Sequence, residues 1–247
     1  MKKWIIIAIS TLVAFVLLGV VSIFFIVGVA NRAAYKRETQ TLVVDTFAAL
    51  RKTKSGGPAK SLAVFEQLKE DSGNAADQLE SQPAPRGAEE LKTDAIQVID
   101  LAADIADRGI LMFTYVDKVD KIISRWSDEI KSANSQSDPI AKLQKDQTAT
   151  DKAGTELKGL RPPGSLVSFH LELTELLATM TTKLGDMAAA ANAKDAAKLK
   201  TLSSEWETLA TRIDKLSSTI GSDLADDIMP PGDQRKLERL ATKIDSF

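Results

Sequence analysis

The chain of 247 residues contains one histidine, His170, in the stretch LRPPGSLVSFHLELTELL at 160–177. Histidine can act as a general base or a metal ligand near neutral pH, provided that partner side chains stand at a suitable spacing. Di-iron helical bundles use a Glu-x-x-His pair, but the residue three positions before His170 is Val167. What remains is a two-residue pairing of His170 with Glu172, Glu175 or a nearby serine, without a third group to orient the ring.

Other short motifs with known chemistry are absent from the sequence. A His-Glu-x-x-His zinc site needs two histidines, and the zinc deaminase signature, whose start resembles His170-Leu171-Glu172, needs cysteines that the chain does not contain. There is no Gly-x-x-x-x-Gly-Lys-Ser/Thr loop, no Gly-x-Gly-x-x-Gly turn and no Gly-x-Ser-x-Gly elbow. We therefore expect no catalytic residue, no metal site and no cofactor, and we predict that the protein is not an enzyme.

The residues around His170 predict a structural role for this side chain. Two prolines end the preceding helix, Gly164 supplies the turn, and Ser165 is expected to cap the next helix. Phe169 falls on the apolar stripe of that helix, which places His170 at the edge of the stripe. We expect the imidazole to pack against a neighbouring helix and to point one nitrogen at solvent or at a carboxylate.

Residues 4–30 contain no charged side chain, and their only polar side chains are Ser10, Thr11 and Ser22. As a helix this segment is about 40 Å long, more than the roughly 30 Å of a bilayer's hydrocarbon core. A cleaved signal peptide is the alternative, with 28–30 as a small-x-small cleavage site, but signal peptides have apolar cores of only about 7–15 residues. The sequence predicts a single-pass anchor in the cell membrane.

The orientation of this anchor is predicted from its flanks. Lys2 and Lys3 precede the apolar segment, and Arg32, Lys36 and Arg37 follow it, so the positive charges are nearly balanced. A short basic tail before a long apolar segment is the usual start of an exported bacterial protein. We therefore expect the chain after the anchor to be extracytoplasmic.

The rest of the chain predicts an all-α fold, an elongated antiparallel helical bundle with coiled-coil-like seams. Clusters of Pro, Gly and small polar residues at 54–60, 81–87, 132–139, 159–165 and 229–234 separate helical segments. The clearest segment is 88–133, where apolar residues alternate at spacings of four and three. The residues of this seam are Leu91, Ala95, Val98, Ala102, Ile105, Gly109, Met112, Val116, Val119, Ile123, Trp126 and Ile130. The acidic residues of the segment, from Asp94 to Asp120, are assigned to its solvated face.

Two further stripes, at 166–187 and 202–220, predict an antiparallel hairpin joined at 192–195. The expected organisation is an anchor at 1–30, a juxtamembrane helix at 31–58 that can continue the anchor, a bundle at 59–228 and a short C-terminal helix at 229–247. An offset of 78 residues aligns Pro85 with Pro163 and the apolar positions that follow them. This alignment suggests a duplicated helical hairpin, although shared heptad spacing produces part of the agreement.

Composition limits the partners of this bundle. The net charge is −2 and both signs are mixed along the chain, whereas nucleic-acid binding needs a basic stripe. We therefore predict no nucleic-acid partner. The expected partners are the lipid bilayer, through residues 4–30, and another membrane or envelope protein or a second copy of the chain.

Three functions follow, in order of preference. The first is a non-catalytic interaction protein at the membrane, acting as a scaffold, adaptor or accessory subunit. The second is an extracytoplasmic ligand-binding sensor; an apolar anchor before a cysteine-free bundle resembles the sensory half of bacterial chemoreceptors and sensor kinases, although no second spanning segment follows here. The third is a hydrolase that uses His170. The residues predicted to contact a ligand or partner are Phe169, His170, Met180, Met187, Trp126 and Trp206, and a sensor cavity would add Met112.

Overall fold

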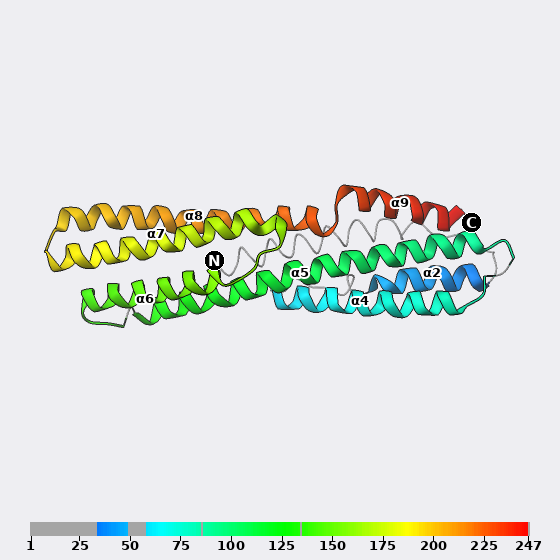
Figure 1. The fold of residues 1–247 in the computed structure, drawn as a ribbon, viewed down its shortest axis with the longest axis horizontal. Helices are drawn as coiled ribbons and strands as arrows, with labels where there is room; N and C mark the ends of the chain where they lie inside the picture. Colours follow the sequence, from blue (N-terminus) through cyan, green and yellow to red (C-terminus); the bar gives the residue numbers. More distant parts are fainter. Residues whose placement is uncertain (1–33, 49–57, 85, 134, 247) are drawn as a thin grey trace. The chain divides into compact units, whose positions relative to one another are not determined.

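The structure is a computed structural model that describes residues 34–48, 58–84, 86–133 and 135–246. These residues form α-helices and one short 3₁₀ turn, with no strand among them, so the predicted all-α fold is confirmed for this part of the chain (Figure 1). The elements are α2 (Ala34–Thr46), α4 (Pro58–Ser81), α5 (Glu89–Ala133), α6 (Pro139–Lys158), η1 (Gly164–Leu166), α7 (Val167–Asn192), α8 (Ala196–Ile228) and α9 (Pro231–Ser246).

The predicted membrane anchor lies outside the described residues. So does the junction at which a juxtamembrane helix would continue it, because α2 is described only from Ala34 onward. Among the helices that the structure describes, none is long and apolar enough to cross a membrane.

Helix α5 agrees closely with the sequence pattern. It runs from Glu89 to Ala133, one residue shorter than the predicted 88–133. Every residue of the predicted seam is buried except Ile130, which is half-buried. Glu89 and Glu90 in the first turn and Lys131 in the last turn also suit the positive and negative ends of the helix dipole.

One acidic residue of α5 does not lie on the solvated face to which the sequence assigns it. Asp94 is only 7% exposed, whereas Asp100, Asp104 and Asp107 are exposed. Its Oδ1 atom lies 3.5 Å from Nζ of Lys243 on α9. The expectation was wrong for Asp94 because helical spacing does not reveal that a basic residue far along the chain will cover this position.

The described residues fall into two compact units. Unit 1 contains Tyr115–Ile220, and unit 2 contains the described residues up to Thr114 together with those after Ile220. Both α5 and α8 therefore contribute residues to each unit.

Unit 1 consists of the second part of α5, α6, α7 and most of α8. Helices α7 and α8 form the predicted antiparallel hairpin, side by side in Figure 1, with ion pairs from Lys183 to Glu205 at 2.6 Å and from Arg212 to Glu172 at 3.3 Å. The turn between them places Lys194 at φ 54°, with the amide of Asp195 donating to the carbonyl of Ala190. This is a Schellman-type helix end, in which the left-handed residue lets the chain reverse.

Helix α6 lies between α5 and α7 in unit 1. Arg125 of α5 pairs with Glu156 of α6, and Lys152 of α6 pairs with Glu129 of α5 at 2.8 Å. On its other side, a Cβ built on Gly154 would lie 3.6 Å from Cβ of Leu177 on α7. These two sets of contacts place α6 against both neighbours, as in an antiparallel bundle.

Unit 2 consists of α2, α4, the first part of α5, the end of α8 and α9. Phe65 of α4 stacks on Phe113 of α5, with ring centroids 5.5 Å apart. Arg108 of α5 donates through Nε to the carbonyl oxygen of Ile228, at the end of α8, and through Nη2 to Asp233 in the first turn of α9, at 3.0 and 2.6 Å. A single guanidinium therefore binds the carbonyl end of one helix and the first turn of the next.

The 78-residue offset reaches further than the sequence pattern indicates. Helix α5 begins at Glu89 and α7 at Val167, 78 residues later. In the helices that precede them, buried residues of α4 match buried residues of α6 at the same offset. The pairs are Leu68 with Asp146, Ser72 with Thr150, Ala75 with Ala153, and Leu79 with Leu157. Spacings of four and three are common to helices of any bundle, so duplication of a helical hairpin stays a prediction.

Gly109 is a position of close approach between α4 and α5. A Cβ built there would lie 2.3 Å from Cδ1 of Phe65, a ring that is fully buried and stacked on Phe113. Gly73 of α4 is exposed, and a Cβ there meets nothing within 4 Å. The two glycines therefore occupy opposite environments in the same pair of helices.

We predict that Gly109→Ala destabilises the protein by about 1–3 kcal/mol, because the buried ring must leave its preferred position. Gly73→Ala should stabilise it by up to about 1 kcal/mol, since alanine favours a helix more than glycine does. Urea unfolding followed by circular dichroism measures both free energies. Equal effects of the two substitutions would show that α4 and α5 do not pack as described.

Candidate functional site

The imidazole of His170 lies against α5 in unit 1. Its Nδ1 atom is 2.8 Å from the hydroxyl oxygen of Tyr115, and the two rings meet edge to face with centroids 6.0 Å apart. His170 is 8% exposed and Tyr115 is 4% exposed. Packing of the imidazole against a neighbouring helix is therefore confirmed, and the partner of Nδ1 is a phenol, which the sequence analysis did not expect.

Burial keeps both members of this pair neutral. Desolvation lowers the pKa of His170 below its ordinary value of 6.5 and raises the pKa of Tyr115 to about 12. At neutral pH the phenol can then donate to Nδ1, which leaves the imidazole proton on Nε2. The pair acts as a neutral hydrogen bond between α5 and α7.

A neutral pair of this kind is poorly suited to nucleophilic chemistry. A tyrosine with a raised pKa is harder to deprotonate, and an imidazole with a lowered pKa is a weaker base. The Nδ1 lone pair is also already occupied by the phenol. The geometry favours a role in fixing the rotation of two helices over a role in catalysis.

The sequence contains a clue that Tyr115 is the partner of His170, although the search for catalytic motifs did not identify it. A buried tyrosine needs a hydrogen-bond partner for its hydroxyl, and the chain has only two tyrosines and one histidine. Tyr115 directly precedes Val116 of the α5 seam, so it lies at the edge of the seam. A tyrosine suits this place because its ring is apolar and its hydroxyl is polar. Which polar group would meet it could be decided only by the packing of α7.

A second polar contact lies between α5 and α6. Nε1 of Trp126 donates to Oγ1 of Thr150 at 3.0 Å, and that hydroxyl donates to the backbone carbonyl of Asp146 at 2.7 Å. Trp126 is 6% exposed and Thr150 is fully buried. The indole therefore belongs to the core of unit 1, with its one polar atom satisfied.

Asp146 is the least satisfied polar group beside this contact. It is 6% exposed, and among the described residues its Oδ1 atom has no hydrogen-bond partner. Desolvation raises the pKa of Asp146, and Lys142 and Lys145 oppose part of that rise. Because the folded-state pKa lies above the ordinary 3.8, the protonated carboxyl favours folding at low pH, and this stability is lost as the pH rises through the folded-state pKa.

The six predicted contact residues all lie in unit 1 but have different surroundings. Met180 is buried like Trp126 and His170, whereas Phe169, Met187 and Trp206 are half-buried. Met112, the further residue of the predicted sensor cavity, belongs to unit 2. Of the seven, His170 and Trp126 have interhelical hydrogen bonds, and both bonds go to residues that the sequence analysis did not select.

The start of α7 differs from the expected cap. Residues Gly164–Leu166 form a 3₁₀ turn, and α7 begins at Val167 with Leu166 as its N-cap and no side-chain cap hydrogen bond. Ser165 therefore lies within the turn and is not the capping residue. The turn also buries Leu166 and His170, and leaves Phe169 half-buried between them, so the predicted order of burial at 169 and 170 is reversed.

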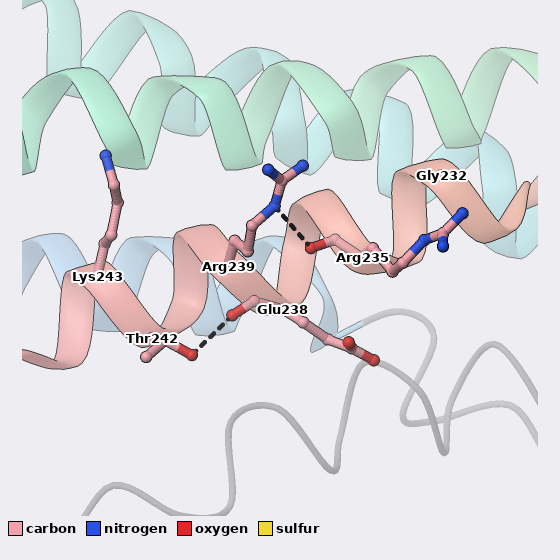
Figure 2. Close-up of a pocket in the computed structure, with 6 residues that line it drawn as sticks. All are labelled: Gly232, Arg235, Glu238, Arg239, Thr242 and Lys243. Atoms are coloured by element: carbon pink, nitrogen blue, oxygen red, sulfur yellow. Dashed lines mark hydrogen bonds between the residues drawn. The ribbon is translucent and has the colours of Figure 1, made fainter.

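A hollow on α9 is a separate surface feature of unit 2. It is lined by Gly232, Arg235, Glu238, Arg239, Thr242 and Lys243, all exposed side chains of one helix face (Figure 2). None of the residues predicted from the sequence as contacts contributes to it. Three of the six lining residues are cationic, which gives this hollow a chemistry that the core pairs do not have.

Metal binding finds no support among the residues that the structure describes, because they contain no group of three or more His, Cys, Asp or Glu side chains that could hold an ion. Comparison with known proteins gives no relative: no protein-family model, no curated protein and no solved structure matches the chain. A function for the chain can therefore be inferred only from its own sequence and structure.

We predict that Tyr115→Phe destabilises the fold by about 1–3 kcal/mol, because it leaves Nδ1 of a buried imidazole without its donor.

In the wild type, the lowered pKa of His170 means that the unfolded state binds more protons, so stability is lost as the pH falls below about 6.5. In His170→Gln this loss should disappear while the helical circular dichroism remains. Thermal melts between pH 5 and 8 test both variants, and an unchanged pH dependence in His170→Gln would contradict the buried pair.

Proposed function

We propose that the protein is a membrane-anchored helical-bundle interaction protein, a scaffold, adaptor or accessory subunit without catalytic activity of its own. The observation that carries this proposal is the Tyr115–His170 pair. The chain's one imidazole is buried, neutral and bonded to a phenol between two helices, so the residue best able to perform chemistry is used for packing.

The membrane part of the proposal rests on residues 4–30, whose uncharged length suits a bilayer. Helix α2 begins at Ala34, shortly after this segment, so the anchor would lead directly into unit 2. The helical chain that follows would present binding surfaces outside the bilayer. The short basic N-terminal tail favours the extracytoplasmic side for this part of the chain.

A surface suited to a protein partner is the outer face of α7. Leu171 and Val167, one turn apart, are 62% and 40% exposed. Ala178 and Thr182, further along the same face, are also exposed and uncharged. The ion pairs of α7 with α8 use Glu172 and Lys183, which lie off this face, whereas Glu175, one turn beyond Leu171, is an exposed charge at its edge. Two bulky apolar side chains exposed one turn apart on a helix favour contact with another protein.

The anchor and its orientation can be tested with one cysteine. Because the chain contains none, Ser135→Cys introduces a unique thiol at an exposed position. We expect it to react with a membrane-impermeant maleimide on intact bacterial cells, after permeabilisation of any outer membrane. Labelling only after lysis would reverse the orientation, and a mature N-terminus near residue 31 would contradict the anchor.

The partner surface can be tested by photocrosslinking from α7. We expect a photoreactive phenylalanine analogue at Leu171 to give a discrete adduct in cells, and Leu171→Asp to reduce recovery of the same partner. Leu111 is the matched control, since it is 58% exposed on α5 but has no second exposed bulky apolar side chain one turn away, as Leu171 has in Val167. Adducts of equal yield from both positions would contradict a specific surface on α7.

A further inference from the structure

Helix α9 separates its apolar and basic residues onto opposite sides. Its buried residues are Leu237, Leu240, Ala241 and Ile244. At 100° per residue, its four basic residues all fall on one arc on the other side, and all are exposed. These residues are Arg235, Lys236, Arg239 and Lys243.

Asp233 and Glu238, two acidic residues of α9, compete little with this arc. Asp233 lies to one side of it and pairs with Arg108 of α5. Glu238 lies to the other side, and Figure 2 shows its carboxylate pointing away from the side chains of Arg239 and Lys243. The outer surface of α9 therefore has a cationic face, which we define as Arg235, Lys236, Arg239 and Lys243. Lys243 also lies 3.5 Å from Asp94 and 3.8 Å from Glu90 of α5, so that its charge is partly compensated.

Two guanidinium groups of this face are not engaged by carboxylates. Nε of Arg235 donates to the carbonyl of Pro231 at 3.1 Å, and Nε of Arg239 donates to the carbonyl of Arg235 at 3.4 Å. Neither forms an ion pair with a carboxylate of the described residues. The Cα atoms of Arg235 and Arg239 are one helical turn, or about 6 Å, apart along the helix axis, and both side chains line the hollow of Figure 2. Each planar guanidinium can bind an anion through two nitrogens.

The end of α9 lies at the same end of unit 2 as the start of α2. Nε2 of Gln82, just after α4, donates to Oε1 of Glu38 in α2 at 2.7 Å, and Nζ of Lys92 in α5 donates to the carbonyl of Gln82 at 2.7 Å. Lys243 of α9 reaches Asp94, half a turn beyond Lys92 on α5. These contacts join the starts of α2 and α5 to the end of α9, as Figure 1 shows for this unit.

We propose that the cationic face of α9 binds the phosphate groups of anionic phospholipids at the surface of the membrane that holds the anchor. This inference rests on the proposed function, because it places the start of α2 at the bilayer surface. The chain would enter unit 2 at the end where Lys243 and Arg239 lie, within reach of the headgroup layer. A planar guanidinium matches a phosphate group, and clustered Lys and Arg next to a membrane segment are attracted to anionic lipid.

The test uses the full chain in nanodiscs of phosphatidylcholine alone or mixed in equal parts with phosphatidylglycerol. A fluorophore on Ser246→Cys, an exposed position at the end of α9, reports contact with a quencher attached to lipid headgroups. The test variant is Arg235→Gln with Arg239→Gln. The matched control is Lys198→Gln with Lys200→Gln, which removes the same charge from exposed positions at the start of α8 in unit 1.

We expect at least twofold stronger quenching in the phosphatidylglycerol discs, loss of that increase in the α9 variant, and its retention in the control. About 0.5 M salt should also remove it, since screening is then strong within a few ångströms. Equal quenching in both lipids, or an unchanged increase in the α9 variant, would overturn the proposal.

The anchor is tested separately, by measuring whether the chain copurifies with the nanodiscs at that salt concentration. A chain that dissociates there contradicts the anchor. If that chain still binds phosphatidylglycerol discs at low salt and the α9 variant does not, the cationic face is supported; if both bind equally, it is overturned.

Discussion

Helix α5 is 45 residues long, and its continuity depends on burial of one apolar seam from Leu91 to Trp126. A single helix of this length gains little from backbone hydrogen bonds alone in water, because propensity contributes only marginally and packing of the apolar face supplies most of the stability. In unit 2 the seam is covered by α4 and by the end of the chain, and in unit 1 by α6 and α7. Both units depend on this helix as their common framework.

Small residues and polar pairs then decide how other helices meet that framework. Gly109 admits the ring of Phe65 at a distance that no side chain would allow. The Tyr115–His170 and Trp126–Thr150 contacts hold α7 and α6 at defined rotations, because a buried donor without its acceptor is costly. Apolar side chains can slide past one another with little penalty, whereas these pairs have one satisfactory geometry each. The polar groups of the core therefore specify the bundle more than they strengthen it.

The outer faces of α7 and α9 have contrasting chemistry. α7 exposes Leu171 and Val167 one turn apart, which suits a protein surface, while α9 exposes a basic face that includes Arg235, Lys236 and Arg239, which suits phosphate. Both helices bury their other side within their own unit. In the proposed function, α7 would bind a protein and α9 would bind lipid, each through its own unit.

The sequence by itself determined the helices of the described chain and most of the seam. The alternation of four and three along 88–133 is a property of neighbouring residues, and α5 follows it to within one residue. The helix breakers, such as the pair of prolines at 162–163, act locally and placed the ends of the helices with similar success. The anchor at 4–30 remains a prediction from length and lack of charge.

Only the tertiary structure decided which residues from distant segments meet. The burial of Asp94 required Lys243, 149 positions later in the chain, and the partner of His170 required Tyr115 from another helix, 55 positions earlier. The start of α7 became a 3₁₀ turn that buries His170 more deeply than the stripe predicted. Periodicity gives the angle of a side chain around its own helix, but burial depends on which helix covers that angle, and this is fixed only when the bundle packs.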